Sequence, residues 1–385
     1  FYAGDFNGDG KFDFVCTSDW NKSNWDGYQL YLMPSDKNSL LTEITDGLGN
    51  QTKIDYKYLS DNTVFTRGKT HSYPLVSIGS SWPVVSSIST PDGVGGTNVV
   101  SYKYENALFH NNGRGLLGFE KCHIKDEATN TLNTTEYSVN TDKYVIAPVH
   151  SQTTINGVKV EECDYTHTLK TGYAPSSYNT SIYSYVPTWT RQRNYEFNTG
   201  ITVKDVTTSN DYDLFGNTTE IVVNDGNVET TTTNTFTNDT DKWILGRLTA
   251  STVSKSNENG TITRKSTFEY DKNSGLLTKE TFAPDNSTLG IRKTYVHDGF
   301  GNIIKSIESP LSNSQERVTV STYDARGRFM TSSTNSLGFT ETSTTDNATG
   351  LVTSEMDKNG IVTHYTYDKL GSLIEATTPI SKSMK

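Results

Sequence analysis

The stretch from Ile361 to Leu373 reads IVTHYTYDKLGSL. In an extended chain the side chains at 361, 363, 365 and 367 lie on one face, and those at 362, 364 and 366 lie on the other. The residues are β-branched or aromatic, which suits a pleated surface. Asp368 can begin a turn, and Gly371 can supply the positive φ of a tight reversal. The stretch therefore predicts a β-hairpin, with a second strand from Leu373 to Thr378.

The same phrase, an aromatic or histidine, an acid, a glycine and then aliphatics, recurs along residues 208–379. Its aspartates are Asp271, Asp298, Asp324 and Asp368, together with Asp346 of a weaker copy that keeps the acid and the glycine but has Thr345 in place of the aromatic residue. These five follow one another at 27, 26, 22 and 22 residues, and an earlier copy starts at Tyr212-Asp213. A period in the twenties indicates a repeated supersecondary unit. One such hairpin is unstable alone in water, so the copies must pair edge to edge. The predicted fold is all-β, with tandem hairpins joined into a continuous curved sheet.

The recurring phrase resembles the YD repeat, also called the RHS repeat. Trp243-Ile244-Leu245-Gly246-Arg247-Leu248-Thr249 is similar to a phrase of the B component of bacterial Tc insecticidal toxin complexes and SpvB-like proteins. Residues 113–120 read GRGLLGFE and resemble the GRGFLGF phrase of the same family, with Leu116 in place of the usual Phe. Before them, residues 41–58 and 84–104 each have the pattern of a hairpin. We expect a Tc-B middle-region-like domain at 36–205 and YD/RHS repeats at 206–385.

The first residues carry a candidate calcium loop. Oxygen ligands recur at every second position, namely Asp5, Asn7, Asp9, the carbonyl of Lys11, and Asp13. Such spacing can wrap a hard cation such as Ca²⁺. An EF-hand would place Glu where Cys16 stands, so the loop instead resembles those of FG-GAP or VCBS β-propeller blades. Residues 1–35 are therefore predicted to be a truncated blade with a structural calcium ion; the alternative is a turn that holds no ion.

Composition limits the partners. The chain has 385 residues, only 33 % of them hydrophobic, and a formal charge of −10. An acidic chain offers no basic patch for phosphates, so nucleic acid is excluded as a partner. It has no apolar run near 18 residues, so we expect no membrane insertion by this segment. The three cysteines, Cys16, Cys122 and Cys163, match no disulfide or zinc framework and are expected to be thiols. Because the chain starts at Phe1, inside a motif, we expect it to be a fragment of a longer protein.

The sequence does not predict an enzyme. It contains no Gly-x-Ser-x-Gly elbow, no HExxH and no Asp-Pro pair of the kind that self-cleaves in many RHS proteins. The stretch Gly113-Arg114-Gly115 lacks the lysine and the hydroxyl residue of a phosphate-binding loop. We therefore expect Arg114 to bond a carboxylate or backbone carbonyls at a seam of the β shell. Five aromatic residues could bind a sugar or a partner, but burial against the sheet is the expectation; they are Tyr173, Tyr178, Tyr183, Tyr185 and Trp189.

Two functions remain. The resemblance implies a segment of a secreted, extracellular bacterial toxin-complex protein, whose β shell encloses a cytotoxic polypeptide and contacts the other subunits of the complex. The alternative is a cell-surface YD-repeat adhesin that binds glycan or a host protein through exposed tyrosines and threonines.

Overall fold

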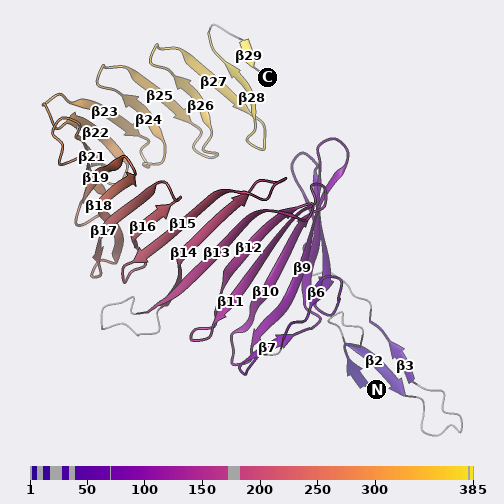
Figure 1. Ribbon diagram of the computed structural model, residues 1–385. Helices are drawn as coiled ribbons and strands as arrows, with labels where there is room; N and C mark the ends of the chain where they lie inside the picture. Colours follow the sequence, from indigo (N-terminus) through magenta and orange to yellow (C-terminus); the bar gives the residue numbers. More distant parts are fainter. Residues whose placement is uncertain are drawn as a thin grey trace, which may run out of the picture. The chain divides into compact units, whose positions relative to one another are not determined.

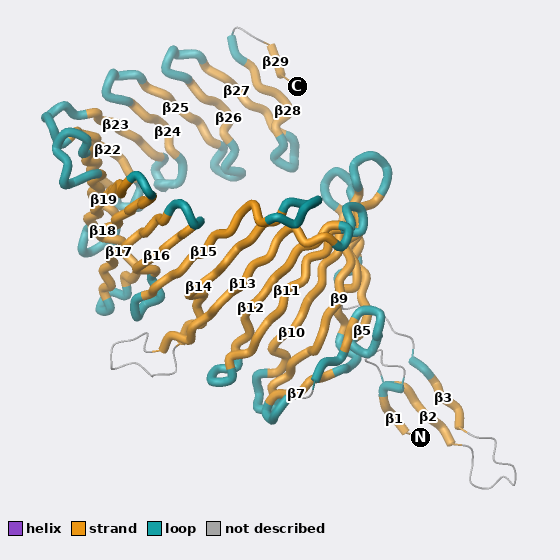
Figure 2. Tube along the Cα trace, viewed as in Figure 1, coloured by secondary structure: helices purple, strands orange, loops and turns teal. Residues whose placement is uncertain are grey.

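The computed structural model describes residues 2–6, 12–17, 28–33, 40–69, 71–171, 183–379 and 382–384 (Figure 1). Within these residues the chain forms strands and turns and contains no helix (Figure 2). The all-β prediction is confirmed. The chain divides into two compact units. Unit 1 comprises Phe1–Gly172, Thr180–Asn210 and Val223–Gly226, and unit 2 comprises Tyr173–Asn179, Asp211–Val222 and Asn227–Lys385. The domain boundaries expected at 36 and 206 remain predictions.

A small sheet lies at the start of unit 1. It has three antiparallel strands in the order β1 (Tyr2–Gly4), β2 (Asp13–Thr17) and β3 (Tyr28–Tyr31). Tyr2 pairs with Val15, and Val15 pairs with Leu30. Large side chains of all three strands are exposed, among them Tyr2, Phe14 and Tyr28.

The main sheet of unit 1 is built from long strands that lie side by side (Figure 1). Neighbours pair antiparallel in the order β4, β5, β8, β9 and then on to β15, while β7 pairs antiparallel and β6 parallel with β9. The strands are β4 (Glu43–Thr45), β5 (Gln51–Tyr58), β6 (Phe65–Thr66), β7 (Leu75–Ile78), β8 (Pro83–Pro91), β9 (Thr97–His110), β10 (Gly115–Asp126), β11 (Thr131–Asn140), β12 (Val145–Ile155), β13 (Val158–Thr171), β14 (Tyr183–Tyr195) and β15 (Thr202–Tyr212).

Unit 2 is a meander of shorter strands. From β17 to β29 each strand pairs antiparallel with the next. The strands are β17 (Glu229–Asp239), β18 (Ile244–Asn257), β19 (Gly260–Tyr270), β20 (Leu277–Phe282), β21 (Ile291–His297), β22 (Ile303–Pro310), β23 (Arg317–Tyr323), β24 (Met330–Thr334), β25 (Thr340–Thr345), β26 (Val352–Met356), β27 (Val362–Tyr367), β28 (Leu373–Thr377) and β29 (Lys382–Met384). The remaining strand, β16 (Thr218–Asn224), lies where the units divide.

The hairpins expected from the sequence are present. Residues 41–58 contain β4 and β5, residues 84–104 contain most of β8, the turn after it and the first part of β9, and β27 and β28 form the hairpin of the repeat phrase. His297 ends β21 and pairs with Ile303 of β22, as expected for a ring that takes the place of the repeat tyrosine.

The wall has almost no interior. A cluster of Leu59, Val64, Phe65 and Ala107 in unit 1 forms the core among the described residues. The chain exposes 24618 Å², whereas a compact monomer of 42.7 kDa exposes about 15,000 Å². This excess is expected when a sheet is one layer thick and both of its faces are wet. Stability must therefore come chiefly from the backbone hydrogen bonds between strands, from the turns and from cross-strand side-chain pairs rather than from a core.

Candidate functional site: the sheet wall

The turn of the repeat phrase is held by its aspartate. Oδ1 of Asp368 accepts hydrogen bonds from the backbone N–H groups of Leu370 and Ser372, both at 2.8 Å. The backbone N–H of Gly371 donates to the carbonyl of Asp368, and Gly371 adopts a φ of +84°. The bond from the Ser372 N–H, with the other donors of the turn, holds the pKa of Asp368 below its usual range. Asp368 thus closes the hairpin as a charged acceptor.

The same device recurs at both ends of the short strands. Residues 335, 346, 357 and 368, each Asn or Asp, accept backbone N–H bonds through Oδ1 and follow one another at intervals of eleven residues. The repeat phrase predicted the turns at Asp346 and Asp368 and missed those at Asn335 and Asp357, which lie between its copies. An Asx residue three positions before Gly, as in Asn335 to Gly338 and Asp357 to Gly360, is the signal that would have found the others.

Successive turns along one edge of unit 2 stack on each other. An apolar side chain of each turn lies over the glycine of the next turn. The contacts join Ile244 to Gly275, Leu276 to Gly301, Phe300 to Gly327, Phe329 to Gly350 and Leu351 to Gly371. All five glycines have φ between +65° and +93°. The glycine therefore meets two demands at once, a left-handed backbone and room for a neighbouring side chain. We call this row the turn stack.

Polar bonds tie the same turns together. Lys242 donates to the backbone carbonyl of Lys272 at 2.8 Å, and Asn302 donates to the carbonyl of Gly327 at 2.8 Å. Arg328 donates to Oδ1 of Asn347 at 2.8 Å. Each bond joins one turn to the following one, so the edge is linked by side chains as well as by the strands.

A row of charged side chains crosses one face of unit 1. One residue of each strand from β9 to β14 stands directly opposite the next, and acidic residues alternate with basic ones. The row is Glu105, Lys121, Glu136, His150, Asp164 and Arg191. We call this row the charge ladder. Opposite charges at facing positions stabilise a given register, and like charges there would oppose it. A slip of one residue would turn the whole row to the other face.

Two facing pairs of the charge ladder are in direct contact. Nζ of Lys121 lies 2.6 Å from Oε1 of Glu136, and Nδ1 of His150 lies 2.7 Å from Oδ1 of Asp164. Arg191 donates twice to the carboxylate of Asp205 on β15, at 2.8 and 2.6 Å. The bond from Lys121 holds the pKa of Glu136 below its usual range. These side chains are partly exposed, so each pair adds little by itself.

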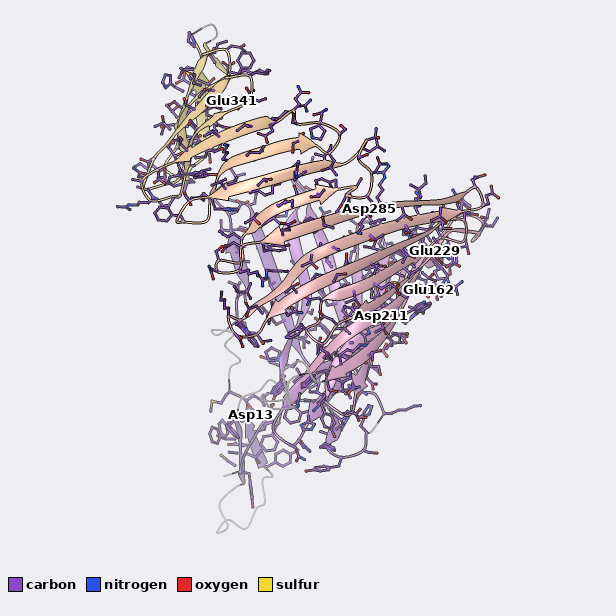
Figure 3. The ribbon with its side chains drawn as sticks, turned by 90° about the vertical axis from the view of Figure 1, so that its left-hand side faces the viewer. Asp13, Glu162, Asp211, Glu229, Asp285 and Glu341 are labelled. Atoms are coloured by element: carbon purple, nitrogen blue, oxygen red, sulfur yellow. The ribbon has the colours of Figure 1, made fainter. Side chains whose placement is uncertain are left out.

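Further polar side chains of β13 and β14 lie beside the charge ladder and contact its residue Asp164. Arg193 contacts the carboxylates of Glu162 and Asp164, and Tyr195 donates to Glu162 at 2.6 Å. Figure 3 labels Glu162 on the sheet of unit 1. The hydroxyl of Tyr195 holds the pKa of Glu162 below its usual range, and Lys159 acts in the same direction. The result is a dense network of paired charges, which suits a wall that meets water.

Arg114 bonds a tyrosine hydroxyl rather than the expected carboxylate or carbonyls. Its guanidinium Nη1 lies 3.2 Å from the hydroxyl oxygen of Tyr183, to which it donates, and no carboxylate pairs with it among the described residues. Tyr183, Tyr185 and Trp189 lie on β14 and are half-buried, which agrees with packing against the sheet. Tyr173 and Tyr178 lie outside the described residues.

The candidate calcium loop is described only in part. Asn7, Asp9 and Lys11 lie outside the described residues, while Asp5 is exposed and Asp13 is fully buried. The two carboxylate oxygens of Asp13 accept backbone N–H bonds from Phe6 and Met33, both at 2.9 Å. Asp13 thus joins the start of the small sheet to the segment after β3. A carboxylate oxygen keeps a second lone pair after one such bond, so these contacts are compatible with a ligand role.

Sequence reasoning missed a strained polar centre in β9. Asn106 is 2 % exposed and has a φ of +50°, although it lies inside strand β9. Its amide donates to Oε2 of Glu120 at 2.7 Å, and its side-chain oxygen accepts from Ser77. A Cβ on Gly68 would lie 2.5 Å from the Asn106 side chain, so the glycine makes room for it. Asn is the residue besides Gly that most readily adopts this backbone conformation, and the buried amide is paired.

No helix of the described residues is long and apolar enough to cross a membrane. The three cysteines are free thiols, as expected.

Tandem antiparallel hairpins, closed by Asx turns and paired edge to edge, form the kind of β-sheet wall that a YD/RHS-like repeat predicts. Residues 347–379 match the family model described as RHS Repeat. Residues 1–156 match the model described as insecticide toxin TcdB middle/N-terminal region. The resemblance to YD/RHS proteins and to the B component of Tc toxin complexes is therefore confirmed.

Solved structures share this fold. The crystal structure of TcdB2-TccC3-TEV aligns with a TM-score of 0.67 at 11 % identity and covers 98 % of this chain and 26 % of its own. The structure of TcdB2-TccC3 without its hypervariable C-terminal region aligns with a TM-score of 0.62 at 10 % identity and covers 88 % of this chain and 24 % of its own. The complex TcdB2-TccC3-Cdc42 gives 0.61 at 10 % identity over 86 % and 24 %. The chain thus spans about a quarter of these structures. No curated protein matches it in sequence.

Proposed function

We propose that this chain is a structural segment of a toxin-complex protein, and that its wall encloses a polypeptide cargo. The observation that carries the proposal is the single-layer sheet, which exposes 24618 Å² and has only a small core. A wall of this kind has two wet faces. One face can line a space that holds a chain away from proteases, while the other meets the medium.

The mode of stabilisation supports this role. The charge ladder favours one strand register in unit 1, and the turn stack joins successive turns in unit 2. Unpaired edges invite aggregation, and a paired wall avoids them. The residues that carry these contacts serve the wall itself, and we propose a structural rather than a catalytic role for the segment.

The partners and location follow from the same proposal. The matched structures are named as complexes of TcdB2 and TccC3. By analogy, this chain contacts other subunits of a toxin complex, shields a toxin polypeptide and acts outside the bacterium that secretes it. The adhesin alternative instead requires the wall to display its faces to a host surface.

Protease protection tests the enclosing role. The full-length protein is purified with its cargo and digested, and intact cargo is followed over time beside the same cargo released by denaturant. We expect the enclosed cargo to survive until the wall unfolds. Digestion of enclosed and released cargo at equal rates would contradict the proposal.

We also propose that the loop of Asp5, Asn7, Asp9, Lys11 and Asp13 binds a structural Ca²⁺. Its support is the alternation of oxygen ligands and the buried carboxylate of Asp13. Calcium titration of the full-length protein by calorimetry tests it, with Asp9→Ala as the variant. Equal melting temperatures with calcium and with chelator would exclude the ion.

A further inference from the structure

We propose that a shallow recess beside Trp82 in unit 1 binds a saccharide. The recess has a volume of about 330 Å³ and opens between β7, the start of β8 and the end of β9. Its lining includes Arg67, Ile78, Ser80, Trp82, Phe109 and Asn111. The proposal does not rest on the enclosing role of the wall.

Trp82 supplies a fixed aromatic surface. The residue is 42 % exposed, and its ring lies edge-to-face with Phe109 at 5.9 Å between centroids. Its backbone carbonyl accepts a hydrogen bond from the N–H of Leu59, a core residue, at 3.1 Å. The indole is therefore held in place while part of it faces solvent. An indole offers a large apolar face, which suits the C–H face of a pyranose ring, and a polar N–H.

Polar groups surround this surface. The guanidinium of Arg67 donates to the carbonyl of Ser77 at 3.0 Å and has no carboxylate partner among the described residues. The side-chain amide of Asn111 makes no hydrogen bond within the part of the chain that the structure describes, although its backbone N–H donates to Pro74 at 2.9 Å. These groups retain free donors and, for the amide, a free acceptor.

The combination favours a sugar over an apolar partner. An apolar surface seated on Trp82 would desolvate Arg67 and Asn111 without pairing them, which is unfavourable. Sugar hydroxyls both donate and accept, so one ring can stack on the indole and bond the amide and guanidinium together. Sites of this kind combine aromatic lining with a few placed polar groups.

Glycan-array screening of the full chain, followed by calorimetry with the best saccharide, tests the site. We expect Trp82→Ala to weaken binding at least tenfold, while Trp243→Ala, which removes an exposed tryptophan of unit 2, leaves it unchanged. Circular dichroism checks that both variants fold. If Trp82→Ala fails to fold, Asn111→Ala decides, and weaker binding supports the site. The proposal is overturned if the wild type binds no saccharide at millimolar concentration, or if the recess variant that folds binds as the wild type does.

Discussion

Ile244 of one turn lies against Gly275 of the next, so that a Cβ built on Gly275 would come within 2.9 Å of the Ile244 Cγ2. The two residues are thirty-one positions apart in sequence; Ile244 begins β18, and Gly275 lies in the turn between β19 and β20. This contact explains why the repeat glycine is needed for more than its turn. The backbone conformation and the space above it are both specified by glycine.

We expect Gly275→Ala to destabilise unit 2 more than Gly338→Ala does. Both glycines have positive φ, at +74° and +81°, so both variants bear backbone strain of about 1–2 kcal/mol. A Cβ at Gly338 has no neighbour within 4 Å, whereas one at Gly275 displaces Ile244, which adds about 1–3 kcal/mol of overpacking. The free energy of unfolding from urea denaturation measures the difference. Equal losses for the two variants would mean that the stacking contact contributes nothing.

Asp368→Ala should lower the denaturation midpoint of unit 2, because two backbone N–H groups lose their shared acceptor. Asp368→Asn should lower the denaturation midpoint less, because an amide oxygen can accept the same hydrogen bonds, as Asn335 does in its own turn. Thermal melts of the two variants beside the wild type check this order. An alanine variant as stable as the asparagine variant would show that the side-chain acceptor is dispensable.

Acid should weaken the wall in a definite window. The pKa values of Asp346, Asp357 and Asp368 are held below their usual range, chiefly by backbone N–H bonds. A carboxyl whose folded pKa is depressed contributes stability above its unfolded pKa, and that contribution is lost as pH falls through the folded value. We therefore expect constant contributions from these turns above about pH 5 and a decline below about pH 4.

Denaturation midpoints between pH 7 and pH 3 test this window. The triple variant with Asn at positions 346, 357 and 368 should show a shallower decline, because its amides do not titrate. If the wild type and the triple variant decline in parallel, other carboxyls govern the acid response.

Gly68→Ala should destabilise unit 1 by about 1–3 kcal/mol, because the new Cβ meets the buried side chain of Asn106 and a packed site resists extra atoms. Gly299→Ala serves as the control, since a Cβ there meets nothing within 4 Å and its φ lies outside the left-handed region. Urea denaturation compares the two. A neutral Gly68→Ala would show that the loop moves away from Asn106 without cost.

Cys122 should react slowly with alkylating reagents in the native protein. Burial raises the pKa of its thiol to about 11, so little thiolate is present at pH 8. Mass spectrometry after brief iodoacetamide treatment, with and without denaturant, measures the protection of this residue. Equal modification of Cys122 in both samples would contradict the assignment of a half-buried thiol with a raised pKa.

The fold could be predicted from the sequence because its period and its turn chemistry are local. The hairpin of the repeat phrase can be predicted from one short segment, because Asp368, Gly371 and the alternating residues before them lie within about a dozen residues. The turns at Asn335 and Asp357 were missed, since they lie between the copies of the phrase that set the period.

The side-chain networks could not be predicted. Glu105 and Arg191 belong to one charge ladder, but their place in it depends on five successive strand registers and on bulges that shift them. Arg114 was expected at a carboxylate or carbonyls and instead bonds Tyr183, because β14 begins beside the turn that carries it. The recess at Trp82 needs β7 and β9 to be paired, which no local pattern reveals.

Electron cryomicroscopy of the full-length protein tests the central claim most directly. We predict a hollow particle whose wall is one sheet thick, with residues 208–379 traced as consecutive paired strands. An extended rod, or density in which these residues form helices or hairpins that share no ladder, would contradict it.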